Sequence, residues 1–475
     1  MVNKKIKNIC CIGAGYVGGP TMAVIAKYCP DIQVTVTDHN KERIAEWNSK
    51  DLSKLPIYEP GLDDIVDKYR GTNLHFSSEV EKNISIADMI FISVNTPTKL
   101  KGIGAGKASD IKWVEACARQ VAKHAKNHTI IVEKSTLPVR TAEVIKKILE
   151  SATSSLQNKN SSISFDVLSN PEFLSEGSAI KDLEAPDRVL IGGENNEAIK
   201  SLSEIYENWV PNEKILYTSI WSSELAKLTA NAFLAQRISS INSIGALCEA
   251  TGADVREVAR AIGTDSRIGA KFLDAGPGFG GSCFKKDILN LVYLASYFGL
   301  DEVANFWESV VKLNYWHQNR ISRLIVEKLF GTLSDKRIAI LGFAFKANTN
   351  DTRESAAIKI CQDLLEEGAI LNIYDPKVFT KQILKDLNLI DPPQSATNEL
   401  NKFNRCFIKD NIYETFQDAD AILILTEWSE FSNINWKSAY KIMRKPCWVF
   451  DSRSIVNPEK VLAANLKLWR IGDGS

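Results

Sequence analysis

The chain has 475 residues, more than one ordinary domain holds, so we expect two or three domains. Lysine and arginine together number 58, as do aspartate and glutamate, and this balance leaves no net charge to attract nucleic acid or an anionic membrane. No apolar run is long enough to span a bilayer, and the first residues lack a secretory signal. Nine cysteines without paired spacing and five histidines without a cluster predict reduced thiols, a cytoplasmic protein and no bound metal.

The first elements predict a dinucleotide-binding turn. An apolar strand over 6–12 leads into Gly13-Ala14-Gly15-Tyr16-Val17-Gly18, and residues 20–26 are typical of a helix. In this pattern the first glycine makes a tight turn, the second lets backbone approach a pyrophosphate, and the third lets the helix pack on the strand. The next apolar run, 34–37, ends at Asp38, whose carboxylate can accept hydrogen bonds from a ribose diol and would repel a 2′-phosphate. We therefore expect the chain to bind NAD rather than NADP.

A similar order of elements recurs in the C-terminal part. In each half a first strand is followed by a turn, a strand that ends in Asp, and a third strand opened by Ala-Asp. Nearly continuous apolar strands separated by helical stretches are typical of parallel sheets covered on both faces. The fold class is therefore α/β, with two Rossmann-like, doubly wound parallel-sheet domains. The predicted strands are 6–12, 34–38, 87–94, 129–133 and 165–169 in the first half, and 336–342, 371–376 and 419–427 in the second.

A helical central domain joins these two halves. Residues 221–251 place apolar side chains largely at helical spacing, and Gly252 can end that helix. Residues 289–329 are also mostly helical, and we expect a long helix there that couples the domains or forms an oligomer seam. The polar run 151–164 is most simply a surface loop. The expected domains are an N-terminal one over 1–219, a central helical one over 220–330 and a C-terminal one over 331–475.

The run Gly278-Phe279-Gly280-Gly281-Ser282-Cys283-Phe284 predicts an accessible, reactive thiol. Its glycines let the main chain approach a ligand closely and donate N–H groups to it. Lys285, Lys286 and Asp287 follow at once and can tune the ionisation of the thiol or move its protons. The alternative interpretation is a glycine-rich turn before a helix, with a buried structural cysteine.

Taken together, these motifs make the chain resemble the eukaryotic UDP-glucose 6-dehydrogenases of the UDP-glucose/GDP-mannose dehydrogenase family. The resemblance covers almost the whole chain, and its motifs follow one another in one order. Besides the glycine fingerprint and the Cys283 run, they are Tyr58-Glu59-Pro60-Gly61-Leu62, Val94-Asn95-Thr96-Pro97-Thr98, Glu133-Lys134-Ser135-Thr136, Asn170-Pro171-Glu172-Phe173-Leu174, Lys227-Leu228-Thr229-Ala230-Asn231-Ala232-Phe233 and Gly342-Phe343-Ala344-Phe345-Lys346.

The resemblance implies a particular reaction, the oxidation of carbon 6 of the glucose in UDP-glucose to a carboxylate with two NAD⁺ and one water. A thiolate at Cys283 would attack the intermediate aldehyde, a second hydride would leave the thiohemiacetal, and the resulting thioester would be hydrolysed. Lys227 and Asn231, four residues apart on one predicted helix face, would stabilise the oxyanion on the carbon 6 oxygen.

The remaining catalytic candidates are Asp287, Thr136 and Glu172. The resemblance implies that they position water or carry out acid–base steps in thioester hydrolysis. Without this constellation, Lys227 would be interpreted as a solvated helix charge and Glu172 as an N-terminal helix cap.

The resemblance also assigns ligand residues and an assembly. The family reaches Arg267 across a subunit boundary, which implies a homo-oligomer, a hexamer built as a trimer of dimers. Lys346, Arg267 and Arg453 suit a diphosphate and a sugar diol. The residues expected to bind NAD are Gly13, Ala14, Gly15, Tyr16, Val17, Gly18, Asp38, Arg43, Val94, Asn95, Thr96, Pro97, Thr98, Ser135, Thr136, Glu176, Lys286 and Arg353. Those expected to bind UDP-glucose are Glu172, Phe173, Leu174, Ser175, Glu176, Lys227, Asn231, Arg267, Asp274 to Gly280 (with Phe279 and Gly280 foremost), Phe345, Lys346 and Arg453.

Three segments depart from the family's usual pattern. Ala347-Asn348-Thr349-Asn350-Asp351 stands where KDTGD is common, and Asp451-Ser452-Arg453 where DGR is usual. Asp274-Ala275-Gly276-Pro277 replaces KASV or NASV. This last change puts a carboxylate and a proline beside the expected pyrophosphate region, so it bears on substrate affinity.

Two other functions stay open at this point. A sibling dehydrogenase acting on UDP-N-acetylmannosamine or GDP-mannose would share both nucleotide domains and a cysteine loop. A catalytically silent nucleotide-sugar sensor is the alternative from a different class. The joint presence of Cys283, Lys227, Asn231, Asp287 and Thr136 argues against the sensor.

Overall fold

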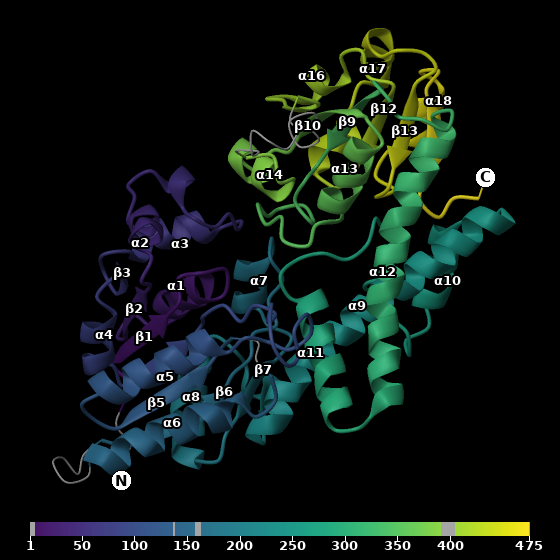
Figure 1. Ribbon diagram of the computed structural model, residues 1–475. Coiled ribbons are helices and arrows are strands. Elements are labelled where there is room, and N and C mark those ends of the chain that lie inside the picture. Colours follow the sequence, from purple (N-terminus) through teal and green to yellow (C-terminus); the bar gives the residue numbers. More distant parts are fainter. Residues whose placement is uncertain (1–4, 136–137, 157–162, 391–403, 475) are drawn as a thin grey trace. The chain divides into compact units, whose positions relative to one another are not determined.

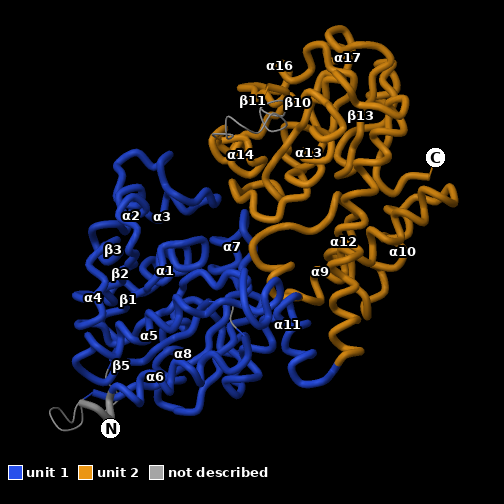
Figure 2. Tube along the Cα trace, in the orientation of Figure 1, with its two compact units in different colours: residues 1–230, 289–300 blue, residues 231–288, 301–475 orange. Residues whose placement is uncertain are grey.

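The computed structural model describes residues 5–135, 138–156, 163–390 and 404–474. It divides into two compact units, which Figure 2 draws in different colours. The first unit comprises residues 1–230 and 289–300, and the second comprises residues 231–288 and 301–475. Each unit contains one large sheet, as the repeated order of predicted strands indicated.

The first unit holds an eight-stranded sheet in the order β3-β2-β1-β4-β5-β6-β7-β8. Its first six strands run parallel, in the 3-2-1-4-5-6 order of a doubly wound dinucleotide-binding domain. β7 runs antiparallel to β6, with Ser169 opposite Gly192, so the sheet is mixed at this end. The five strands predicted in this half are all confirmed. The strands are β1 (Asn8–Ile12), β2 (Gln33–Thr37), β3 (Leu74–Ser77), β4 (Met89–Ile92), β5 (Thr129–Glu133), β6 (Phe165–Ser169), β7 (Val189–Gly192) and β8 (Ile215–Thr218).

Helices cover both faces of this sheet, because successive strand side chains point to opposite faces. Cys11 and Phe91 pack with α1 in one core, whereas Cys10 and Ile90 pack with α5 and α6 in another. Figure 1 shows α5 and α6 side by side along the sheet. Burial on both faces explains why these strands are apolar almost throughout. The helices are α1 (Gly18–Tyr28), α2 (Lys41–Trp47), η1 (Leu52–Lys54), α3 (Leu62–Tyr69), α4 (Val80–Ile86), α5 (Lys112–His124), α6 (Thr141–Leu156), α7 (Ala179–Glu184), α8 (Asn196–Tyr206) and η2 (Asn212–Lys214).

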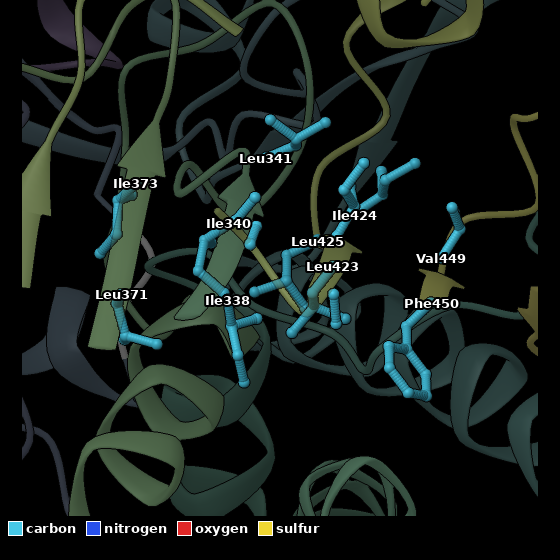
Figure 3. Close-up of a cluster of buried hydrophobic side chains, with 14 of the residues drawn as sticks. Ile338, Ile340, Leu341, Leu371, Ile373, Leu423, Ile424, Leu425, Val449 and Phe450 are labelled. Carbon is cyan, nitrogen blue, oxygen red and sulfur yellow. The ribbon is translucent and has the colours of Figure 1, made fainter. Parts of the chain in front are cut away.

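The second unit holds a six-stranded parallel sheet in the order β11-β10-β9-β12-β13-β14. Counted from β9 this is again 3-2-1-4-5-6, so the predicted repeat is confirmed. In its core, Ile338 and Ile340 of β9 lie beside Leu371 and Ile373 of β10 (Figure 3). The elements are β9 (Arg337–Leu341), α13 (Ala356–Glu366), β10 (Ile370–Tyr374), α14 (Thr380–Asp386), β11 (Cys406–Ile408), α16 (Ile412–Phe416), β12 (Ala421–Ile424), η3 (Ser429–Asn433), α17 (Trp436–Ile442), β13 (Trp448–Asp451), α18 (Pro458–Leu462) and β14 (Lys467–Arg470).

The helical middle consists of α9 (Ile220–Thr251), α10 (Val255–Gly263), α11 (Phe284–Tyr297) and α12 (Asp301–Lys328). Gly252, with φ at +82°, ends α9 as predicted. The helical stretch expected over 289–329 is broken into α11 and α12, because Gly299 takes a φ of +72°. A residue in this left-handed region cannot continue an α-helix, and glycine adopts it without strain. Within the described ranges, no helix is long and apolar enough to cross a membrane.

The surface loop expected over 151–164 is wrong in its first part. α6 continues to Leu156, and residues 157–162 lie outside the described ranges. Ala152 packs against the same core as Ile145 and Leu149. The apolar stripe of the helix therefore extends into the polar run and keeps it helical.

Candidate active site

The glycine fingerprint forms the turn from β1 to α1. Gly13 has a φ of +114°, and its N–H donates to the Thr37 carbonyl at 2.8 Å. A Cβ on Gly18 would lie 2.1 Å from the Gly13 carbonyl oxygen, so only glycine lets the helix start this close to the strand. A Cβ on Gly15 would meet no atom within 4 Å, which leaves the backbone of this turn open to a ligand. Gly13 and Gly18 thus make the tight turn and the close helix–strand approach expected from the sequence, whereas the approach of a pyrophosphate to Gly15 stays a prediction.

Asp38 lies at the end of β2, beside this turn. One carboxylate oxygen accepts the Ala14 N–H at 3.1 Å, and the other accepts the Asn40 N–H at 2.9 Å. Arg43 Nη1 lies 3.8 Å from the first oxygen. No side chain caps α1 at Val17, so the helix presents uncapped N–H groups and the positive end of its dipole. These features fit a dinucleotide, with the pyrophosphate at the helix and the ribose at Asp38.

The other residues predicted for NAD lie in several loops. Val94, Asn95, Thr96, Pro97 and Thr98 follow β4, and Ser135 Oγ donates to the Val94 carbonyl at 2.8 Å. Thr136 lies outside the described residues. Glu176 belongs to the first unit, whereas Lys286 and Arg353 belong to the second.

In the first unit, Lys227 and Glu172 form a buried ion pair. Lys227 extends from α9 and its Nζ lies 3.1 Å from Glu172 Oε1, with the two side chains 5% and 3% exposed. Glu172 also accepts the Leu174 N–H at 2.9 Å. The ring of Phe173 faces cations, with Arg188 3.7 Å and Lys227 5.4 Å from its centroid. The pair therefore has the protonated donor and the carboxylate that an oxyanion step and an acid–base step require.

A second buried lysine stands beside this pair and was missed by the sequence analysis. Lys134 Nζ donates to Asn170 Oδ1 at 3.0 Å and to the Tyr206 hydroxyl oxygen at 3.2 Å. Burial lowers the pKa of Lys134 from 10.5 to about 8, a drop that Glu172 partly offsets and Lys227 reinforces. The available signal was its position next to Ser135 in the Glu133-Lys134-Ser135-Thr136 motif.

In the second unit, Cys283 directly precedes α11, and Asp287 lies in the first turn of that helix. The Asp287 N–H donates to the Cys283 carbonyl at 2.8 Å, and Asp287 Oδ2 accepts from Asn231 Nδ2 at 2.6 Å. Lys286 Nζ lies 3.7 Å from Asp287 Oδ1. Cys283 is half-buried whereas the other eight cysteines are buried. Cys283 thus lies at a helix start and is partly exposed, and the helix N-terminus favours negative charge there.

The segment expected to bind the sugar nucleotide lies against the C-terminal sheet domain. A Cβ on Gly280 would lie 2.6 Å from the Glu354 carbonyl oxygen, and Gly281 faces the Phe345 ring. Arg453 donates from Nη2 to the Phe345 carbonyl and from Nε to the Leu425 carbonyl, both at 2.8 Å. Lys346 Nζ lies 5.6 Å from the Phe345 ring centroid. The structure therefore brings together Gly280, Phe345, Lys346 and Arg453.

Arg267 is placed differently from these residues. Its side chain is 87% exposed and forms an ion pair with Asp265 at 2.6 Å. Ser175 is also exposed, and its N–H donates to Asp182. Arg267 therefore presents most of its side chain to solvent.

Three further polar residues were not predicted, and they contact residues 276–281, which we call the glycine-rich segment. They are Asn242 on α9 and Asn314 and His317 on α12, all of them buried. Polar side chains are rare inside helices that pack apolar cores, and this was the only signal available in the sequence.

Comparison with known proteins agrees with this architecture. Three domain descriptions of one family match consecutive parts of the chain: the NAD binding domain of the UDP-glucose/GDP-mannose dehydrogenase family over residues 7–210, its central domain over 221–316 and its UDP binding domain over 339–458. The chain is 55% identical to UDP-glucose 6-dehydrogenase of Drosophila melanogaster over 469 residues, covering 98% of this chain and 96% of that protein. It is 54% identical to UDP-glucose 6-dehydrogenase of Gallus gallus, covering 95% of this chain and 90% of that protein.

Solved structures show the same fold. A UDP-glucose dehydrogenase from Pyrobaculum islandicum is similar at a TM-score of 0.83 and 27% identity, covering 100% of this chain and 99% of that one. A UDP-D-ManNAc dehydrogenase from Pyrococcus horikoshii is similar at a TM-score of 0.78 and 25% identity, covering 98% of this chain and 99% of that one. Fold and site define an NAD-dependent dehydrogenase. The chain belongs to the UDP-glucose/GDP-mannose dehydrogenase family.

Proposed function

We propose that this chain is an NAD-dependent UDP-glucose 6-dehydrogenase, which oxidises UDP-glucose to UDP-glucuronate. The observation that carries the substrate is the identity of 55% with an enzyme of that name over 98% of the chain. The sibling alternative has weaker support, since identity to the UDP-D-ManNAc dehydrogenase is 25%. The sensor alternative is disfavoured by a thiol, a buried ion pair and a buried carboxylate that sensing does not need.

The cofactor-binding part of the proposal rests on the β1–α1 turn. When bound, NAD accepts a hydride in each of the two oxidations. The uncapped N-terminus of α1 would hold its pyrophosphate, and Asp38 its adenine ribose. Loops after β4 and β5, with Val94 to Thr98 and Ser135, would flank it.

The thiol chemistry rests on Cys283 at the start of α11. Its thiolate would attack the carbon of the intermediate aldehyde, and Asp287, fixed by Asn231, would take or return a proton. Oxidation of the thiohemiacetal leaves a thioester, which water hydrolyses to the carboxylate. Because the aldehyde stays bound to sulfur, it is not released between the two oxidations.

Charge on the carbon 6 oxygen would be stabilised by α9. Lys227 and Asn231 lie one turn apart on this helix, and both are buried, so a charge near them is poorly screened by water. Glu172, paired with Lys227, would act as the base or position the water, together with Thr136.

The sugar nucleotide would be held by the glycine-rich segment and the C-terminal domain. Phe279, Gly280, Phe345, Lys346 and Arg453 are the proposed contacts, with the cations on the diphosphate and the sugar. The match of residues 339–458 to a UDP binding domain supports this assignment.

The proposal includes an assembly and a domain division. Exposed Arg267 would complete the sugar site of a neighbouring subunit in a homo-oligomer, a trimer of dimers. Mixing Arg267→Ala and Cys283→Ala subunits should then restore activity in hybrids, and active hybrids are not expected if each subunit's site is self-contained. The three domains, 1–219, 220–330 and 331–475, are supported by the three matched ranges. We also propose that the protein acts in the cytoplasm, since its nine cysteines form no disulfide.

The function is tested by counting NADH against substrate. Purified protein with limiting UDP-glucose should give two NADH per sugar nucleotide, and mass spectrometry should find UDP-glucuronate. UDP-N-acetylmannosamine and GDP-mannose, the substrates of the sibling dehydrogenases, are assayed under the same conditions for comparison. Faster turnover of either of these would refute the substrate assignment, and one NADH per sugar would refute the four-electron reaction.

A further inference from the structure

In the glycine-rich segment that leads to Cys283, the backbone N–H and carbonyl of both Gly276 and Phe279 are hydrogen-bonded to side chains from two helices. At Gly276, the N–H donates to Asn242 Oδ1 at 2.9 Å, and the carbonyl lies 2.9 Å from His317 Nε2. Because a carbonyl can only accept, His317 Nε2 must carry the proton. Gly276 is therefore held by α9 on one side and by α12 on the other.

Three residues further on, at Phe279, the single side chain of Asn314 binds both the backbone N–H and the backbone carbonyl. Its Oδ1 accepts the Phe279 N–H at 2.9 Å, and its Nδ2 donates to the Phe279 carbonyl at 3.1 Å. Gly278, which lies between Gly276 and Phe279, has a φ of +126°, and a Cβ there would lie 2.8 Å from Asn314 Oδ1. The amide thus occupies the space that a side chain at position 278 would need.

These three side chains are costly to bury unless their hydrogen bonds form. Asn242, Asn314 and His317 are 1%, 6% and 1% exposed. An unsatisfied buried polar group costs about 1–3 kcal/mol, so apolar residues would be the cheaper way to pack these helices. Burial lowers the pKa of His317 from 6.5 to about 4, so the imidazole is neutral and a fixed donor at physiological pH.

The segment has few other means of holding its conformation. Gly278, Gly280 and Gly281 carry no side chains, and glycine has the largest conformational freedom of any residue. Besides the hydrogen bonds from Asn242, Asn314 and His317, which we call the clamp, the Gly281 N–H donates to the Arg353 carbonyl at 2.8 Å. Cys283 follows two residues later and directly precedes α11. The position of the thiol therefore depends on hydrogen bonds made from outside the segment.

We propose that Asn242, Asn314 and His317 are positioning residues that fix the backbone from Gly276 to Phe279 and thereby the sugar-nucleotide contacts and the Cys283 thiol. The role rests on the proposed function, because it concerns the same segment. It goes beyond that function by assigning three helix residues that touch neither the reacting thiol nor the expected carboxylate and lysine.

The test compares variants that differ only in the hydrogen bonds to the segment. His317→Leu removes the donor to Gly276, whereas His317→Gln can place an amide donor where Nε2 stood. Asn314→Ala removes both bonds to Phe279. Ser322→Ala is the matched control: Ser322 lies on the same helix and donates to Asp363 at 2.9 Å, away from the segment. Each variant is measured for melting temperature, NAD affinity, kcat and KM for UDP-glucose, and the rate of Cys283 alkylation by iodoacetamide, followed by peptide mass spectrometry.

We expect Asn314→Ala and His317→Leu to lower kcat/KM for UDP-glucose at least tenfold and to raise the alkylation rate at least threefold, with NAD affinity within twofold. His317→Gln should recover most of the loss seen in His317→Leu. Ser322→Ala should leave kcat/KM and alkylation within twofold, whatever its melting temperature.

The role is overturned if the clamp variants lose no more activity than Ser322→Ala at an equal loss of melting temperature. It is also overturned if His317→Leu and His317→Gln behave alike. The alkylation measurement needs no substrate, so it still decides the role if wild-type protein fails to turn over UDP-glucose. Such a failure would count against the proposed function alone.

Discussion

Asn231 Nδ2 donates to Asp287 Oδ2 at 2.6 Å and so ties α9 to the first turn of α11. Both residues are buried, at 5% and 1% exposure. The helix turn that holds Asp287 begins at Cys283, whose carbonyl accepts the Asp287 N–H. One hydrogen bond therefore links Asn231, proposed to stabilise the oxyanion, with Asp287, the carboxylate nearest in sequence to Cys283. Asp287 is for this reason the first residue to test.

Asp287→Asn should keep the size of the side chain but remove its charge and its ability to take a proton. We expect kcat to fall by about 100-fold or more, the range typical for loss of a general base. The melting temperature should change little, since an amide oxygen can still accept from Asn231. Steady-state kinetics with UDP-glucose measures the effect, and a kcat within threefold of wild type would remove Asp287 from the chemistry.

Lys227→Met should leave Glu172 as a buried carboxylate without its ion-pair partner. Breaking a buried pair in this way costs about 3–5 kcal/mol of unfolding free energy. Adding Glu172→Gln should return most of the lost stability but none of the lost turnover. Urea unfolding and kcat are measured for both variants, and recovery of activity in the double variant would mean that the pair has only a structural role.

Stability should depend on the protonation of Lys134. Its pKa is about 8 in the folded protein against 10.5 when unperturbed. Below pH 8 both states carry the proton, whereas between pH 8 and 10.5 the unfolded state binds more protons than the folded one. The unfolding free energy contributed by Lys134 therefore rises with pH across this window, by at most about 3 kcal/mol at 1.36 kcal/mol per unit.

Subtracting the unfolding free energy of a Lys134→Met variant from that of the wild type separates the contribution of Lys134 from those of other groups that titrate at high pH. The difference in unfolding free energy, wild type minus variant, should be flat from pH 6 to 7.5 and should increase from pH 8 to 10.5. A difference that stays constant throughout would show that Lys134 titrates normally.

Asp38 should make the protein prefer NAD⁺ to NADP⁺. Its carboxylate is held by the Ala14 and Asn40 N–H groups, so it cannot easily move away from a 2′-phosphate. We expect kcat/KM to be at least about tenfold higher with NAD⁺, since like charges about 4 Å apart near a protein surface repel by up to about 4 kcal/mol. Asp38→Asn should narrow this ratio. Comparable use of NADP⁺ by the wild type would contradict the role of Asp38.

The sequence predicted those elements whose signal is local. The turn of Gly13 to Gly18 and the apolar strands follow from short patterns, so both sheets and the start of α1 were anticipated. The break at Gly299 was missed because a single glycine within a helical pattern is often tolerated. The extension of α6 was missed because the packing of Ala152 against a distant core outweighs the polar composition around it.

Candidate site residues could be named from the sequence where they lie in motifs shared with a known family, as for Cys283, Lys227 and Asp287. Lys134 and His317 were missed because they are distinguished only by their burial and by partners far along the chain. Lys134 meets Asn170 and Tyr206, and His317 meets Gly276. No local pattern encodes such pairings, which exist only once the helices and strands have packed.

Cys283→Ser tests whether catalysis is covalent at this residue. A hydroxyl is a poorer nucleophile than a thiolate at neutral pH, and an ester is less reactive than a thioester. The measurement is kcat for UDP-glucose, with mass spectrometry of the intact protein after mixing with substrate and NAD⁺. We expect unchanged binding of both ligands, turnover lower by roughly a hundredfold or more, and a protein mass increased by the sugar nucleotide. Turnover of Cys283→Ser at the wild-type rate would contradict covalent catalysis at Cys283.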